Sequence, residues 1–175
     1  MSRYAKEVNK YLVAIKKGDK SKYQPLYDLT ANHLLVVAAY YLKDHSYCED
    51  VVSIVFAKIF KNIDTYKEGH DAYNWICKIT ENTAHDINDG LKDEVALDNL
   101  IPSYTREISE EDYEEKLDVT RAIDKLDDPI DKEIVYGYYF FDKTYQQIAE
   151  ELNLTKSTVK KRMDKILIKL KNFLK

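Results

Sequence analysis

The sequence predicts an all-α protein of two small helical domains joined by an acidic linker. Apolar residues recur at helical spacing along most of the 175 residues, and no segment alternates apolar and polar residues as a half-buried strand does. Charge falls in blocks, since residues 87–120 hold 11 acidic and 3 basic side chains, whereas residues 155–175 hold 8 basic and 1 acidic. We therefore expect one domain over residues 1–90, the linker over 91–117 and the second domain over 118–175.

Helices of the first domain are expected where apolar residues repeat every three or four positions. Gly18 and Asn88-Asp89-Gly90 end two of these helices. Gly69 lies among polar residues, so the segment 64–70 is expected to be a loop. The expected helical segments are residues 4–17, 21–42 (two turns and helices), 47–63 and 72–87.

The second domain is expected to contain a helix-turn-helix. Ile148, Ala149 and Leu152 recur at i, i+1 and i+4 and give one helix a single buried stripe. Asn153 lies where the tight turn needs a left-handed residue, and Thr155 is placed to cap the next helix. Before this motif, helical segments are expected at residues 110–117, 118–126 and 130–141.

The helix that follows Thr155 has an inner apolar face and an outer cationic face. Val159, Met163 and Ile166 are expected to face the core. The N-terminal part of the outer face presents amide and ammonium donors, which suit a DNA groove that carries phosphates and base edges. Turn, cap and charge together favour DNA binding over a generic surface helical hairpin. The outer residues are Lys156, Ser157, Lys160 and Lys161.

Two long stretches carry a resemblance to a known family. The first is LYDLTANHLLVVAAYYLKDHSYCEDVVSIVFAKIFKNIDTY over residues 26–66, followed by the pattern Trp75-Ile-x-x-Ile79-x-x-Asn82-x-Ala84-x-Asp86. The second is AIDKLDDPIDKEIVYGYYFFDKTYQQIAEELNLTKSTVKKRM over residues 122–163. In this order and spacing they resemble a bacterial RNA polymerase sigma factor of the extracytoplasmic-function type. Such a protein retains only the promoter-melting domain and the domain that reads the −35 element, so the resemblance implies promoter-directed initiation by core RNA polymerase.

For the −35 domain the resemblance implies roles along the exposed helix. The base-reading residues would be Lys156, Ser157, Lys160 and Lys161. Other side chains are better placed for phosphates, which position a protein on DNA without specifying sequence. These are Thr144, Thr158, Arg162 and Lys165. A solvated surface would explain any one lysine, but the basic excess lies on one helix.

The segment 64–74 corresponds, in the resemblance, to the loop that receives a base flipped from the −10 element. Capturing a flipped base needs hydrogen-bonding groups and an apolar or stacking wall. Trp75 is expected to be a core residue at the start of the next helix rather than a stacking platform. The residues implied for −10 DNA are Tyr66, Lys67, His70, Tyr73, Asn74, Lys78 and Asn82.

Two carboxylates begin the helix that, in sigma factors, docks on the clamp helices of the largest catalytic subunit of the polymerase. Glu49 and Asp50 would pair there with basic polymerase residues, or else favour the helix dipole alone. Ser53 belongs to the same expected polymerase-binding surface. The family usually has a Gln-Glu or Gln-Asp pair where this chain has Ser53 and Ile54, so polar contacts are lost and docking is expected to be weakened or altered.

A second departure from the family pattern lies after Ala84. Sigma factors commonly carry an arginine-rich stretch there, whereas this chain reads HDINDGLKDEVALDN over residues 85–99. With few cations to neutralise phosphates, intrinsic −10 binding is expected to be weak and to depend on polymerase and the second domain. The acidic linker is expected either to mimic RNA in the polymerase cleft, as the resemblance implies, or to serve as a solvated tether.

Enzyme and metal chemistry are not expected. The four histidines lie in different segments, and neither a nucleophile signature nor a Gly-rich phosphate loop is present. His45-x-x-Cys48 has zinc-ligand spacing, with Cys77 or His85 available to complete a site, but the motif is weak and no cofactor is expected. The first residues lack an apolar signal region, and the longest apolar run, residues 34–42, is about half a bilayer span. A cytoplasmic protein without membrane insertion is therefore expected.

Three function classes stay open on these grounds. The first is a sigma factor whose partners are core RNA polymerase, promoter DNA and, from the family, an anti-sigma factor. The second is a degenerate sigma-like accessory protein, which Ser53, Ile54 and the missing basic stretch favour. The third is a stand-alone helix-turn-helix regulator that binds operator DNA as a dimer without polymerase. Polymerase-dependent transcription separates the three.

Overall fold

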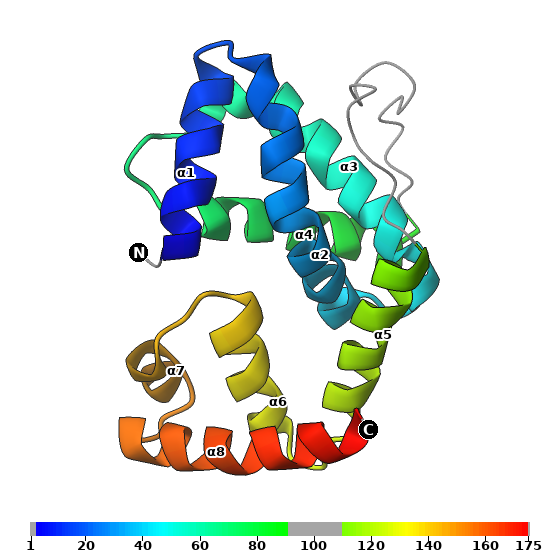
Figure 1. The fold of residues 1–175 in the computed structure, drawn as a ribbon, viewed down its shortest axis with the longest axis vertical. Helices are drawn as coiled ribbons and strands as arrows, with labels where there is room; N and C mark the ends of the chain where they lie inside the picture. The colour runs from blue at the N-terminus through cyan, green and yellow to red at the C-terminus, as the bar shows by residue number, and fades with distance from the viewer. Residues whose placement is uncertain (1–2, 91–109, 175) are drawn as a thin grey trace. The chain divides into compact units, whose positions relative to one another are not determined.

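The computed structural model describes residues 3–90 and 110–174, and within these ranges every regular element is helical (Figure 1). The expected all-α fold is confirmed. The chain divides into two compact units, Met1–Tyr113 and Glu114–Lys175. The linker expected at 91–117 falls mostly outside the described ranges, and the expected domain boundaries stay a prediction. Among the described residues, no helix combines the length and apolar character that crossing a bilayer needs.

The first unit is a bundle of helices joined by short helical turns. Its elements are α1 (Arg3–Lys16), η1 (Lys20–Lys22), α2 (Tyr23–Tyr41), η2 (His45–Tyr47), α3 (Cys48–Lys61), η3 (Ile63–Thr65) and α4 (Ala72–Asn88). Helices α2, α3 and α4 pack against one another, and α1 packs on α2 and α4. Each helix contributes to one core, in which Leu12, Leu34, Phe56 and Ile76 are among the fully buried side chains.

The expected helices of the first unit are present, with small shifts at their ends. The segment expected as two turns and helices is one helical turn, η1, and one continuous helix, α2. Pro25 does not break α2 because it lies in the first turn, where its missing N–H has no partner within the helix. The expected loop at 64–70 begins with η3 and contains Gly69 at φ +86°. Asp71 ends this loop by capping α4, since its carboxylate accepts a hydrogen bond from the Asn74 N–H at 3.1 Å.

Helix α5 (Glu110–Asp124) crosses the division after Tyr113 and lies mostly in the second unit. The second unit also contains α6 (Pro129–Val135), the π-helical turn η5 (Tyr136–Phe140), α7 (Tyr145–Glu151) and α8 (Lys156–Phe173). The segments 110–117 and 118–126, expected as separate helices, form the single helix α5, and the helix expected over 130–141 is α6 followed by η5. Gly137 lies in η5, where an added Cβ would approach Ile148 Cγ1 to 3.1 Å. The absence of a side chain at Gly137 therefore lets α7 pack closely on η5.

The expected helix-turn-helix is present as α7, a tight turn and α8. Asn153 has φ +53°, the left-handed conformation that the turn requires. Thr155 caps α8, because its hydroxyl oxygen accepts a hydrogen bond from the Thr158 N–H at 3.1 Å. Leu152 is only partly buried, whereas the rest of the expected inner face is buried, namely Ile148, Ala149, Val159, Met163 and Ile166.

Candidate functional site

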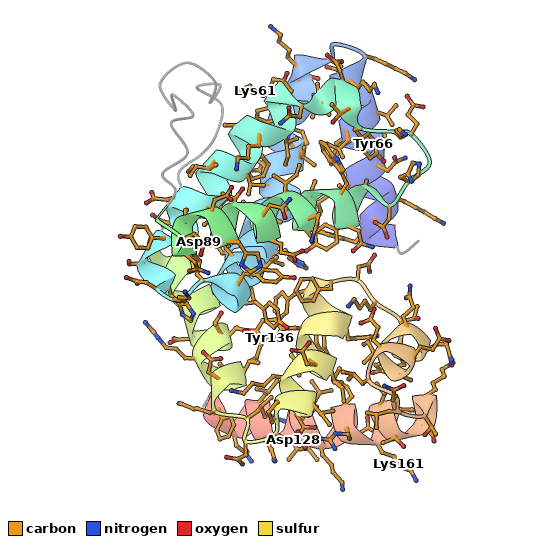
Figure 2. All side chains as sticks on the ribbon, turned by 180° about the vertical axis from the view of Figure 1, so that it is seen from behind. Lys61, Tyr66, Asp89, Asp128, Tyr136 and Lys161 are labelled. Atoms are coloured by element: carbon orange, nitrogen blue, oxygen red, sulfur yellow. The ribbon has the colours of Figure 1, made fainter. Side chains whose placement is uncertain are left out.

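Helix α8 presents a cationic face to solvent. Its inner apolar residues fix the rotation of the helix, so the polar residues between them point outward. In Figure 2 the side chain of Lys161 projects away from the helix. The ammonium groups on this face are accessible to phosphates and base edges. The exposed residues of the face are Lys156, Ser157, Lys160, Lys161 and Lys165.

Arg162 on α8 does not belong to this exposed face. Its Nε donates a hydrogen bond to Asp131 Oδ1 at 2.8 Å, and an Nη forms a second ion pair with Asp128. The hydrogen bond from Arg162 holds the pKa of the Asp128 carboxyl below its usual value. Asp128 also caps α6 by accepting a hydrogen bond from the Ile130 N–H at 2.9 Å. The guanidinium expected on phosphates therefore ties α8 to the first turn of α6.

Of the two threonines expected on phosphates, Thr144 caps a helix and Thr158 bonds the cap of another. Thr144 caps α7 in a capping box, in which its hydroxyl oxygen lies 3.2 Å from the Gln147 N–H and its backbone N–H donates to Gln147 Oε1 at 2.9 Å. Thr158 Oγ1 lies 2.8 Å from the hydroxyl of the α8 cap, Thr155. Thr144 is exposed and Thr158 is half-buried. Their geometry shows local capping, and it leaves a phosphate contact as an untested expectation.

A pocket of about 400 Å³ lies between the loop that follows η3 and the start of α4. It brings together four of the residues expected on −10 DNA, since Tyr66, Lys67, His70 and Asn74 all line it. In Figure 2 the label of Tyr66 lies beside the loop that leads into α4. The remaining lining residues are Thr65 and Asp71, for which no role was expected, and Trp75, which was expected in the core.

Two of the residues that line the pocket are aromatic, Tyr66 and Trp75. The Tyr66 side chain is only 1 % exposed, and its ring centroid lies 5.2 Å from that of Trp75. Burial raises the pKa of the Tyr66 hydroxyl. Trp75, which was expected to be a core residue, is only partly buried and lines the pocket. Asp71 precedes α4 and bonds Asn74, and an aspartate just before a helix is a cap signal that the sequence contains. That signal does not show that Trp75 lines the pocket.

The other residues expected on −10 DNA lie apart from the pocket. Tyr73 is buried, with its ring centroid 4.9 Å from that of Tyr4. Lys78 and Asn82 are exposed farther along α4. Lys78 Nζ lies 2.8 Å from Glu81 Oε2, and this exposed pair reduces the positive charge that α4 offers to a phosphate.

The start of α3 has an acidic surface. Glu49 and Asp50 lie in its first turn and are exposed, and Ser53 on the next turn is half-buried. Ile54 is 7 % exposed and belongs to the core of the bundle. The apolar residue at this departure from the family pattern is therefore a packing residue. The accessible part of the expected polymerase-binding surface is the carboxylate pair with the half-buried Ser53.

The two residues with zinc-ligand spacing, His45 and Cys48, are not part of a group that could hold a metal ion among the described residues. Cys48 is completely buried, and burial raises the pKa of its thiol to about 12, which opposes the thiolate form that binds zinc. Cys77 is also buried. Over residues 3–90 and 110–174 no group of three side chains is arranged to hold a metal ion.

Two family models match the chain. The model described as Sigma-70 region 2 matches residues 26–87, and the model described as Sigma-70, region 4 matches residues 122–172. Among solved structures, a chain of the RsbN–BldN complex is similar at 15 % sequence identity and a TM-score of 0.40, over 92 % of this chain and 97 % of that one. Comparison with curated proteins gives no match. The pocket and the acidic start of α3 lie within the first matched range, and the cationic face of α8 lies within the second.

Proposed function

Because the chain belongs to the sigma-70 family of RNA polymerase sigma factors and directs promoter-specific transcription initiation, we propose a role for each of its three surfaces. Helix α8 reads the −35 element, the pocket before α4 captures a −10 base, and the start of α3 docks on core polymerase. The region 2 match falls within the expected promoter-melting domain, and the region 4 match falls within the expected −35 domain. This is the pair of domains that the resemblance to the extracytoplasmic-function type predicts. The chain contributes recognition and strand separation, while the polymerase carries out RNA synthesis. The exposed lysine face of α8, on a helix whose inner face is buried, is the observation that carries the proposal.

Recognition of the −35 element uses the N-terminal half of α8. In helix-turn-helix proteins this part of the second helix lies in the major groove, where lysine ammonium groups and hydroxyls can bond base edges. Lys165, one turn farther along, is placed for a phosphate. Arg162 and Thr144 are left out of the proposed contacts because their polar groups are engaged within the unit. The base-reading residues are Lys156, Ser157, Lys160 and Lys161.

Capture of a −10 base uses the pocket between η3 and α4. Its volume of about 400 Å³ accommodates a nucleobase, and the partly buried Trp75 offers an aromatic face for stacking. Lys67, His70 and Asn74 add hydrogen-bonding groups around the rim. The base leaves the duplex stack at the cost of unstacking, and the pocket offsets that cost by stacking and hydrogen bonds.

Docking on core polymerase uses the exposed carboxylates of Glu49 and Asp50, with Ser53 beside them. Complementary cations on the polymerase would steer the encounter and fix its register. An anti-sigma factor that covers this surface or the face of α8 is a further proposed partner, and the cytoplasm, where polymerase works, is the proposed location.

The test is transcription in vitro with purified core polymerase on fragmented DNA from the source organism. Specific start sites are expected with the protein and not without it. Lys160→Ala/Lys161→Ala is expected to abolish these starts, because it removes two base-reading groups. The matched control is Lys169→Ala/Lys171→Ala, which removes the same charge from exposed positions at the other end of α8 and should keep the starts.

Each alternative outcome points to another assignment. If both lysine pairs can be removed without effect, −35 recognition does not lie on α8. If Glu49→Lys/Asp50→Lys binds polymerase as tightly as the unchanged protein, docking lies elsewhere. Polymerase binding without any start sites would favour an accessory protein, and no polymerase binding would favour a stand-alone regulator.

A further inference from the structure

The loop that forms the pocket is tied to a helix far away in the sequence. Lys16, the last residue of α1, donates hydrogen bonds from Nζ to the backbone carbonyl oxygens of Asp64 at 2.9 Å and of Tyr66 at 2.5 Å. In both views the segment between α3 and α4 runs beside α1 (Figures 1 and 2). One ammonium group thus bonds two carbonyls where the short turn η3 ends and the loop begins.

A second tie acts on Tyr66, one of the aromatic residues that line the pocket. The Tyr66 hydroxyl lies 2.5 Å from Asn9 Oδ1, and its ring is 1 % exposed. Asn9 and Lys16 are seven residues apart, which places them on one face of α1 two turns from each other. Both the backbone of residues 64–66 and the Tyr66 ring are therefore held from the same helix face.

Neither anchor lines the pocket itself. The lining residues all lie between Thr65 and Trp75, whereas Asn9 and Lys16 lie on α1. Helix α1 also precedes the range 26–87 that the region 2 family model matches. The anchors therefore act on the pocket only through the loop, and the family match does not account for them.

We propose that Lys16 and Asn9 are positioning residues for −10 base capture, because they hold the loop in its base-receiving shape before DNA arrives. A loop already fixed in its bound conformation has less conformational freedom to lose on binding, so capture becomes more favourable. This inference rests on the proposed role of the pocket, and it assigns to α1 a contribution to promoter opening.

The adjacent residue supplies a matched control. Lys17 Nζ lies 3.9 Å from Glu68 Oε1 on the same loop, but the two side chains are 69 % and 54 % exposed. Such a pair adds little in water. Lys16→Met and Lys17→Met remove the same charge from neighbouring positions, and only the first removes a tie to the loop backbone.

Trp75 reports on the pocket without any DNA. It is the only tryptophan of the chain and lines the pocket beside Tyr66. In the free, full-length protein, Lys16→Met is expected to increase quenching of Trp75 fluorescence by acrylamide, because the loop opens, while Lys17→Met is expected to leave it unchanged. Unchanged quenching in Lys16→Met would overturn the inference, whatever the pocket binds.

Promoter opening is then measured with core polymerase at the start sites found by transcription, as permanganate reactivity of −10 thymines. Lys16→Met is expected to reduce opening by about tenfold or more, as for loss of hydrogen bonds to a charged group, with polymerase binding unchanged. Lys16→Arg keeps the donors and should restore part of the opening. Tyr66→Phe keeps the ring but removes the hydroxyl that contacts Asn9 and, at 3.2 Å, the His70 carbonyl oxygen, and it should impair opening without altering α1.

One further variant separates this inference from the function on which it rests. Trp75→Ala removes a wall of the pocket itself. If Trp75→Ala leaves opening intact, the pocket does not capture a base and the proposed function fails at this site. If Trp75→Ala blocks opening while Lys16→Met and Tyr66→Phe do not, the pocket functions but α1 does not position it.

Discussion

Replacing Arg162 with alanine tests whether this residue holds the recognition helix or contacts DNA. The guanidinium bonds Asp131 Oδ1 at 2.8 Å and also pairs with Asp128, so α8 is joined to the start of α6. The sequence alone had assigned Arg162 to a phosphate. The two roles predict different changes in stability and in DNA binding.

The structure sets the size of the expected effect. The Asp131 side chain is 13 % exposed and that of Arg162 is 28 % exposed, so the hydrogen bond between them is largely shielded from solvent. Breaking a hydrogen bond to such a charged group, with its partner left behind, costs about 2 kcal/mol. Asp128, at 42 % side-chain exposure, is better solvated and adds less. A change of about 2 kcal/mol increases local opening of α8 by about 30-fold.

Hydrogen exchange of the α8 amides, measured by mass spectrometry on the full chain, measures the local opening of α8 directly. Arg162→Ala and Asp131→Asn should both accelerate exchange in α8, whereas Lys161→Ala, which removes the same charge from an exposed site, should not. The slope of DNA affinity against salt should stay the same for Arg162→Ala. Unchanged exchange together with a slope lower by about 0.9 would refute the reasoning, since that is the loss of one phosphate contact.

Three other predictions concern stability and reactivity. Cys48 should resist alkylation at about pH 8 until the protein is unfolded by urea, because burial raises its thiol pKa to about 12; rapid labelling of the folded chain would contradict this. Gly137→Ala should destabilise the second unit by about 1–2 kcal/mol, because its Cβ would meet Ile148 Cγ1 at 3.1 Å and Ile148 is buried; α7 amide exchange measures this, and slower exchange would show that Ile148 makes room. Asp128 has a folded-state pKa below its ordinary 3.8, so its stabilising contribution is present above that pH and is lost as pH falls through the lower folded value. The acid dependence of α6 exchange should therefore be weaker in Asp128→Asn, and an equal dependence in both proteins would contradict the assignment.

Local patterns predicted the fold well because helices are encoded by neighbours in the chain. The position of Asn153 in the turn, the cap at Thr155 and the inner face of α8 all follow from spacing within one or two turns. The division of 130–141 into α6 and η5 was missed. That break coincides with Gly137, which packs closely against Ile148 on a different helix.

The candidate site was predicted less completely, because side chains were assigned to faces without knowledge of their partners. Lys67, His70 and Asn74 were expected near a flipped base and do line one pocket. Trp75 was expected in the core, yet it faces that pocket. The spacing of residues in the first turn of α4 was compatible with Trp75 facing either the core or the surface. Its place in the pocket depends on the loop residues before α4, which line the same pocket.

The sequence by itself determined most of the helical elements, the helix-turn-helix and the charge of each exposed face, because these depend on residues within a few positions of one another. Only the tertiary structure decided that Arg162 turns to Asp131, 31 residues away, and that Tyr66 is held by Asn9, 57 residues away. Such pairs depend on how helices distant in sequence pack. Short-range spacing fixes which face of a helix a side chain occupies. The packing of helices decides which charged group or hydroxyl of another helix that side chain contacts.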